Sequence, residues 1–92
     1  MIRLEGKVYR GSALIAMDTQ PLDEKHRDAG FSKRLDVALT VLCKRMGVPL
    51  PIWLNKNTKQ FIRFRQTVFQ PDQFAEKVAF DQFQIKLLED ER

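Results

Sequence analysis

The sequence predicts an α+β fold of two layers, in which an N-terminal β-hairpin and a C-terminal strand form a three-stranded antiparallel sheet with two helices on one face. Apolar and polar residues alternate from Ile2 to Tyr9 and again between Val78 and Leu88, and the apolar run Ala13–Met17 follows the first of these segments. Apolar residues from Phe31 onward recur at helical spacing. Alternation is typical of a half-buried strand, and a spacing of three and four residues is typical of a helix. A hairpin cannot bury its apolar face alone, so the third strand and the helices are expected to cover it.

The N-terminal segment is expected to be a hairpin that turns at Gly11–Ser12, with glycine at the first central position of a two-residue turn. Pro21 ends the second strand, because proline cannot donate a backbone hydrogen bond to a ladder. Gly6, inside the first strand, indicates a bulge or a close approach by another part of the chain. The apolar residues of the first strand share one face: Ile2, Leu4 and Val8.

The segment from residue 31 to residue 46 carries a single apolar stripe and is predicted to be a helix. Ser32 is a suitable N-cap, and Gly47 is a suitable C-terminal stop, followed by Pro49. A residue that precedes a proline is disfavoured in the helical region, so the connector Val48–Pro51 is expected to be extended. The stripe consists of Phe31, Leu35, Ala38, Leu39, Leu42 and Met46.

The segment Asn57–Phe69, NTKQFIRFRQTVF, fits two interpretations. As a strand it leaves Phe61 and Phe69 among charged residues, whereas as a helix it gathers its apolar side chains better. A helix over about residues 56–66 with an extended exit through Phe69 is therefore preferred. In that helix Asn57 is expected to cap the N-terminus, with Gln60 in the third position, and Phe61 and Phe64 are expected to point into the core.

The last strand is predicted over Val78–Leu88, after a turn that begins at Pro71. The alternation changes parity near Asp81–Gln82, so a β-bulge is expected there. The residues after Leu88 are mostly acidic and are expected to fray.

Length and composition indicate one small soluble domain over residues 1–92, with 43% hydrophobic and 30% charged residues. The longest apolar runs are far shorter than the roughly 20 residues that a membrane-spanning helix needs. The single cysteine, Cys43, cannot form an internal disulfide and fits a reducing compartment. The sequence therefore predicts a cytoplasmic protein without a membrane partner.

No residue pattern in the chain predicts catalysis, a metal site or a cofactor. The single histidine, His26, lies in a run of charged residues near Asp23 and Asp28 and is interpreted as a surface residue. Cys43 is interpreted as a packing residue, although Lys44 and Arg45 follow it. The carboxylates Asp72, Glu76 and Asp81 have no recognisable ligand spacing, and the scattered glycines form no phosphate-binding loop. The protein is therefore expected to act by binding.

Positive charge is concentrated in the middle of the chain, where residues 31–70 contain eight basic residues and one acidic residue. Such a face within residues 33–65 is suited to phosphates and predicts, as one hypothesis, binding of nucleic acid. The alternative is that these are solvated helix faces, compensated by Asp72, Glu76 and the acidic C-terminal residues. The candidate anion-binding residues are Lys44, Arg45, Lys56, Lys59 and Arg63.

Apolar residues on the expected solvent side of the first helix suggest a protein interface. Val37 and Val41 lie opposite its main stripe within a frame of cations. Packing beneath the Pro49–Leu54 connector is the preferred interpretation of these valines, and an exposed contact patch is the alternative. The candidate interface consists of Val37, Val41, Leu50 and Trp53. Interaction with another protein or self-association is thus the favoured function, with nucleic-acid binding as the alternative and a small-molecule pocket between helices and sheet as the third possibility.

Overall fold

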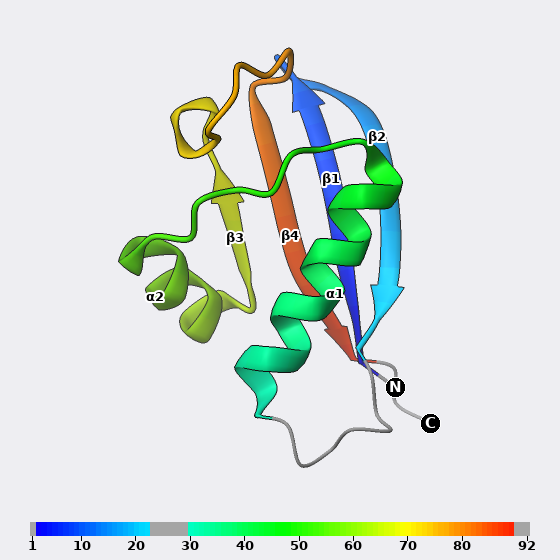
Figure 1. Cartoon of the computed structure of the whole chain (residues 1–92), viewed down its shortest axis with the longest axis vertical. Helices are drawn as coiled ribbons and strands as arrows, with labels where there is room; N and C mark the ends of the chain where they lie inside the picture. The colour runs from blue at the N-terminus through cyan, green and yellow to red at the C-terminus, as the bar shows by residue number, and fades with distance from the viewer. Residues whose placement is uncertain (1, 23–29, 90–92) are drawn as a thin grey trace.

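The computed structural model describes residues 2–22 and 30–89, and in these parts of the chain four antiparallel strands form one sheet with two helices on one face (Figure 1). The strands lie in the order β2-β1-β4-β3. The predicted α+β class is confirmed, and the sheet has one strand more than the three predicted. The elements are β1 (Ile2–Arg10), β2 (Ala13–Pro21), α1 (Phe31–Met46), α2 (Asn55–Phe64), β3 (Gln66–Phe69), the short 3-10 helix η1 (Pro71–Gln73) and β4 (Gln82–Glu89).

The hairpin β1–β2 turns at Gly11–Ser12, as predicted. Gly11 has a φ of +61°, a conformation that glycine adopts at little cost. The register shifts between Val8 and Tyr9, because Val8 lies opposite Ala16 whereas Tyr9 lies opposite Leu14. The irregularity therefore lies close to the turn and not at Gly6.

Gly6 marks a close approach between the sheet and α1. A Cβ atom added to Gly6 would lie 2.9 Å from Cδ2 of Leu42, 3.1 Å from Sδ of Met46 and 3.2 Å from Cε1 of Phe83. The absence of a side chain thus lets α1 lie directly on β1. Of the two features expected at Gly6, a bulge or a close approach, the structure has the close approach.

A single residue separates α2 from β3. Arg65 takes a left-handed conformation with a φ of 59°, and its amide donates to the carbonyl of Phe61 at 2.8 Å. Its own carbonyl accepts from the amide of Leu87 at 2.8 Å, which starts the pairing of β3 with β4. The helix therefore ends two residues earlier than expected, at Phe64 and not at residue 66, and it begins one residue earlier, at Asn55. The predicted extended exit is a paired strand.

The last strand begins later than predicted, at Gln82. Val78 and Phe80 pack against the core from the preceding loop, so the change of parity marks a loop and not a bulge within a strand. Asp81 fixes the junction, because its amide donates to the carbonyl of Tyr9 at 2.8 Å and its carboxylate accepts from the amide of Gly11.

The core lies between the sheet and the helices. Four side chains of the sheet are completely buried in this core: Leu4, Phe69, Phe83 and Ile85. The helix α1 contributes its predicted stripe, except that Phe31 at its first position is exposed. Other buried members of this core include Leu22, Leu35, Ala38, Leu39, Leu42, Cys43, Val48, Phe61 and Phe74.

Candidate functional site

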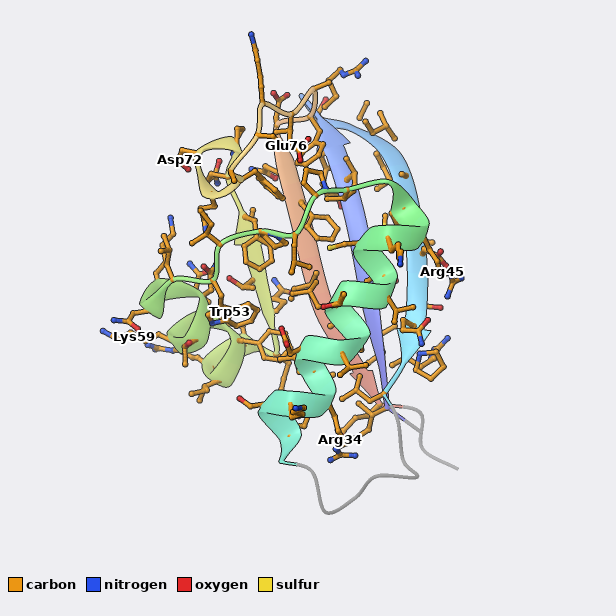
Figure 2. The ribbon with its side chains drawn as sticks, in the orientation of Figure 1. Arg34, Arg45, Trp53, Lys59, Asp72 and Glu76 are labelled. Carbon is orange, nitrogen blue, oxygen red and sulfur yellow. The ribbon has the colours of Figure 1, made fainter. Side chains whose placement is uncertain are left out.

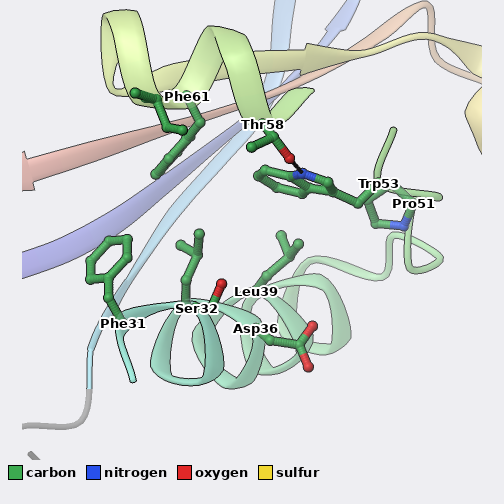
Figure 3. Close-up of a pocket in the computed structure, with 10 residues that line it drawn as sticks. Phe31, Ser32, Asp36, Leu39, Pro51, Trp53, Thr58 and Phe61 are labelled. Carbon is green, nitrogen blue, oxygen red and sulfur yellow. Dashed lines mark hydrogen bonds between the residues drawn. The ribbon is translucent and has the colours of Figure 1, made fainter. Parts of the chain in front are cut away.

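The two helices diverge and leave a groove of about 480 Å³ between them, which we call the α1–α2 groove (Figure 3). The polar side chains at its walls are Ser32 and Asp36 of α1 and Thr58 of α2. Its apolar lining consists of Phe31, Leu35, Leu39, Trp53, Phe61 and Ile62, with Pro51 at one end. The groove is therefore apolar along its length and carries one carboxylate, on the α1 side.

Trp53 forms a fixed wall of the groove. Its ring meets the ring of Phe61 edge-on at 5.9 Å between centroids and lies 5.6 Å from that of Phe69. Its indole N–H donates to the hydroxyl oxygen of Thr58 at 2.7 Å (Figure 3). The half-buried Trp53, predicted as an interface residue, thus presents one side to the groove and rests on the core with the other.

A buried polar network holds α2 in place behind the groove. Asn57 is completely buried, and its side-chain oxygen accepts from the amide of Leu54 at 2.9 Å. Its side-chain nitrogen donates to the hydroxyl of Thr67 at 2.8 Å and to the carbonyl of Val68 at 3.3 Å. Asn57 therefore occupies the third helical position and not the predicted N-cap, which is Leu54.

The same network reaches η1 through Gln73. The side-chain nitrogen of Gln73 donates to the oxygen of Asn57 at 2.9 Å and to the carbonyl of Ile52 at 3.2 Å. The amide of Ile52 in turn donates to the carbonyl of Gln73 at 2.6 Å. Because each polar group of the Asn57 side chain already has a partner, this residue is a structural element and does not bind a ligand.

Three of the predicted cations form a row on the outer side of α2, which we call the basic row: Lys56, Lys59 and Arg63. All three are exposed, and no ion pair joins them to any acidic residue within the described parts of the chain. Asp72 and Glu76 lie beyond the C-terminal end of β3, apart from Lys59 (Figure 2). No described acidic side chain therefore pairs directly with the basic row, and residues 90–92 of the acidic C-terminus lie outside the described residues.

The other two predicted cations lie on a different side of the molecule. Arg45 is at the far flank from Lys59 (Figure 2), where it pairs with the carboxylate of Asp18 at 3.0 Å and the side-chain oxygen of Gln20 at 2.8 Å. Lys44 precedes it in the last turn of α1. The five candidate residues consequently do not form one positive face, and only the basic row brings three of them together.

The sequence predicted that Phe64 points into the core. This prediction is wrong, because the side chain is 59% exposed. The helix α2 packs over β3, which is the edge strand, so its last turn has no further strand to cover it. The guanidinium of Arg63 lies 5.5 Å from the centre of the Phe64 ring. Ile62, on the groove side, is 75% exposed, whereas Phe61 is buried as predicted.

The predicted protein-interface residues divide between two surfaces. Val37 and Val41 are 48% and 36% exposed, so they do not pack beneath the connector as preferred. Both valines lie on the side of α1 opposite its buried stripe. The connector runs along the other side of α1, where Pro51 and Trp53 line the groove. Leu50 is exposed on that connector, and Trp53 lies in the groove.

Cys43 is buried, and burial raises the pKa of its thiol from 9.0 to about 12. The unfolded chain ionises first, so the thiol contributes stability below pH 9 that is lost as the pH rises toward 12, at up to about 1.4 kcal/mol per pH unit. Urea unfolding at several pH values is expected to give a steeper alkaline loss of stability for the natural chain than for Cys43→Ala. Equal slopes, or rapid reaction of the native thiol with a thiol reagent at neutral pH, would contradict this assignment.

The single histidine and a cluster of carboxylates are the remaining candidates for chemistry. His26, with Asp23 and Asp28, lies outside the described residues. Among the residues that are described, no three histidine, cysteine or acidic side chains cluster as ligands for a metal ion.

In the described parts of the chain, neither α1 nor α2 is long and apolar enough to span a membrane. No protein-family model, curated protein sequence or solved structure significantly matches this chain.

Proposed function

We propose that this chain is a protein-interaction module whose α1–α2 groove binds an apolar segment of a partner protein that carries acidic residues on one side. The observation that supports this most is that one helix, α2, forms a wall of an open apolar groove and also carries the basic row, which has no acidic partner in the described parts of the chain. Apolar grooves of this kind receive the apolar face of a helix or an extended segment in known recognition modes.

Burial of apolar surface supplies the driving force for such binding. Phe31 on the α1 wall and Ile62 on the α2 wall are both exposed in the free protein. A bound apolar side chain would cover both and remove their surface from water, at about 25 cal/mol for each Å² buried. The wall formed by Trp53 is already fixed by its contacts, so little ordering of this residue opposes binding.

Charge gives the bound segment an orientation. The basic row runs along α2, whereas Asp36 lies on the α1 wall. Acidic residues of the partner are therefore favoured on the α2 side and disfavoured next to Asp36. Complementary charges at the rim of an interface act mainly on specificity and on the rate of association.

Synthetic amphipathic peptides with one apolar face and acidic, neutral or basic flanks test this proposal. Trp53, the only tryptophan, reports binding through its fluorescence. The acidic peptide is expected to bind best, and Lys59→Glu is expected to weaken it about fivefold, because exposed ion pairs contribute up to about 1 kcal/mol. Lys77→Glu, an exposed lysine outside the basic row, serves as the matched control. Equal binding of the three peptides would contradict the proposal.

Nucleic-acid binding is the second candidate, favoured by the basic row together with the exposed Phe64 ring. The guanidinium of Arg63 lies over the exposed ring of Phe64, so that a cation and an aromatic ring occur together, as in proteins that bind single strands. Fluorescence anisotropy with labelled mixed-sequence DNA and RNA at two salt concentrations separates the two candidates. Binding that weakens steeply with salt and is lost in Phe64→Ala supports nucleic acid, whereas no binding at low salt excludes it.

A further inference from the structure

We propose that a second copy of this chain pairs with β2 along residues 13–17, so that two sheets join across a two-fold axis. This inference is independent of the α1–α2 groove, because β2 and β3 form the two opposite edges of the sheet and the groove is lined by α2, which packs on β3.

Hydrogen bonds between described residues close one half of the β2 edge. The amide of Thr19 donates to the carboxylate of Asp18 at 2.8 Å, and its carbonyl accepts from Arg45 at 3.4 Å. Pro21 has no amide hydrogen to offer. Among the described residues, no contact of this kind reaches the outer side of residues 13–17, so this half of the strand remains available for pairing.

The side chains of the available half are apolar and carry no charge. Leu14 and Ile15 are exposed, and Met17 is 56% exposed. Edge strands are usually protected by lysine, proline or a bulge. The register shift near Ile15 bends this strand but adds neither charge nor proline, so protection is incomplete.

A second apolar patch lies on the same flank, in the helical layer. Val41 is exposed on α1, one turn before Arg45, and Arg45 reaches Asp18 and Gln20 of β2. The side of α1 that carries Val41, and Val37 one turn earlier, therefore lies toward β2. Two exposed patches, one on the sheet edge and one on the helix, thus share this flank.

A second copy offers the same edge and the same side of α1, so that one two-fold contact covers both patches. In this pairing, β2 of one copy lies antiparallel to β2 of the other. The two-fold axis is then perpendicular to the joined sheet, and both α1 helices lie on the same face of it. The contact is then isologous, with the uncharged segment of one copy on that of the other. The valines of the two α1 helices approach each other across the axis.

This arrangement has a distinctive dependence on salt. Exposed Lys33 and Lys44 frame the valines, and a two-fold axis brings like charges from both copies toward each other. Salt screens this repulsion, so the dimer is expected to tighten as salt rises. In contrast, binding of an acidic peptide or a nucleic acid by the basic row is expected to weaken as salt rises.

Sedimentation velocity over a range of protein and salt concentrations tests the proposal on the full chain. We expect a concentration-dependent dimer, weakened about tenfold or more by Met17→Lys and by Val41→Lys. Ile62→Lys, a more exposed apolar residue on the other flank, is expected to leave it unchanged. Urea unfolding of each variant establishes that the fold is retained.

Hydrogen exchange provides a readout at the proposed edge. Protection of the Met17 amide is expected to increase with protein concentration, whereas that of exposed helical termini stays constant. A monomer at every concentration in high salt, or a dimer that neither Met17→Lys nor Val41→Lys weakens, would overturn the proposal. A dimer weakened by Ile62→Lys alone would place the contact on the other flank and would likewise overturn it.

Discussion

Replacement of Asn57 by alanine is expected to lower the free energy of unfolding by about 3–5 kcal/mol, since several buried hydrogen bonds disappear at once. Alanine leaves the side-chain nitrogen of Gln73, the amide of Leu54 and the carbonyl of Val68 without their Asn57 partner. No water reaches a side chain that is completely buried, so the abandoned groups are not rehydrated without a structural change. The loss is large compared with the total stability of a small domain, about 5–15 kcal/mol.

Urea unfolding of the natural chain and of Asn57→Ala measures this loss directly. Asn55→Ala is the matched control, because Asn55 lies two positions earlier on the same helix and is exposed. The control is expected to change stability by less than about 0.5 kcal/mol. A loss below about 1 kcal/mol for Asn57→Ala would mean that the network contributes little to stability.

Gly6→Val is expected to destabilise the fold by about 3 kcal/mol, because the new side chain enters space that α1 already fills. The first carbon alone would lie 2.9 Å from Leu42, which is itself completely buried, and valine adds two methyl groups beyond it. The helix must then lift from β1 or the neighbouring side chains must leave their favoured rotamers. Either response disturbs the packing of α1 on the sheet.

Gly30→Ser provides the comparison for Gly6→Val. A Cβ atom at Gly30 meets nothing within 4 Å, and Gly30 precedes α1 at a position where serine is favoured. This variant is expected to be as stable as the natural chain or slightly more stable. Thermal or urea unfolding distinguishes the two glycines, and equal stability of Gly6→Val and the natural chain would refute the close packing at β1.

The elements with long regular patterns were predictable from the sequence. The hairpin, its turn at Gly11–Ser12 and the helix that ends before Gly47 are as expected. The helix begins earlier than the expected cap at Ser32, because its N-cap is Gly30. Sustained periodicity reports which face is buried, and burial dominates the choice of structure over such lengths. The glycine at position 47 indicated the helix end because it accepts a left-handed conformation, which it has with a φ of +69°.

The strand β3 was not predictable in the same way. It has four residues, which is too few to establish alternation, and the turn before it uses Arg65 in a left-handed conformation. Glycine or asparagine is the usual signal for this turn, so an arginine gives no indication of a helix end. The pairing with β4 stabilises the turn and decides the structure there.

The sequence predicted which cations share a face of α2, but it did not predict the groove between the two helices. The basic row was identified from its spacing on one helix, because local spacing fixes which residues share a helical face. Lys44 and Arg45 could not be separated from it without knowledge of how the helices cross the sheet. The groove joins Phe31 to Ile62 across 31 positions of sequence, and only tertiary packing brings such residues together.

Chemical-shift mapping by NMR during titration with the acidic-flanked peptide tests the central claim most directly. The proposed function predicts that the perturbed residues gather on both walls of the α1–α2 groove, with Phe31 and Leu39 on one side and Ile62 on the other. The perturbations are expected to diminish as salt rises. Perturbations confined to β2, or spread over the surface without a cluster in the groove, would contradict it.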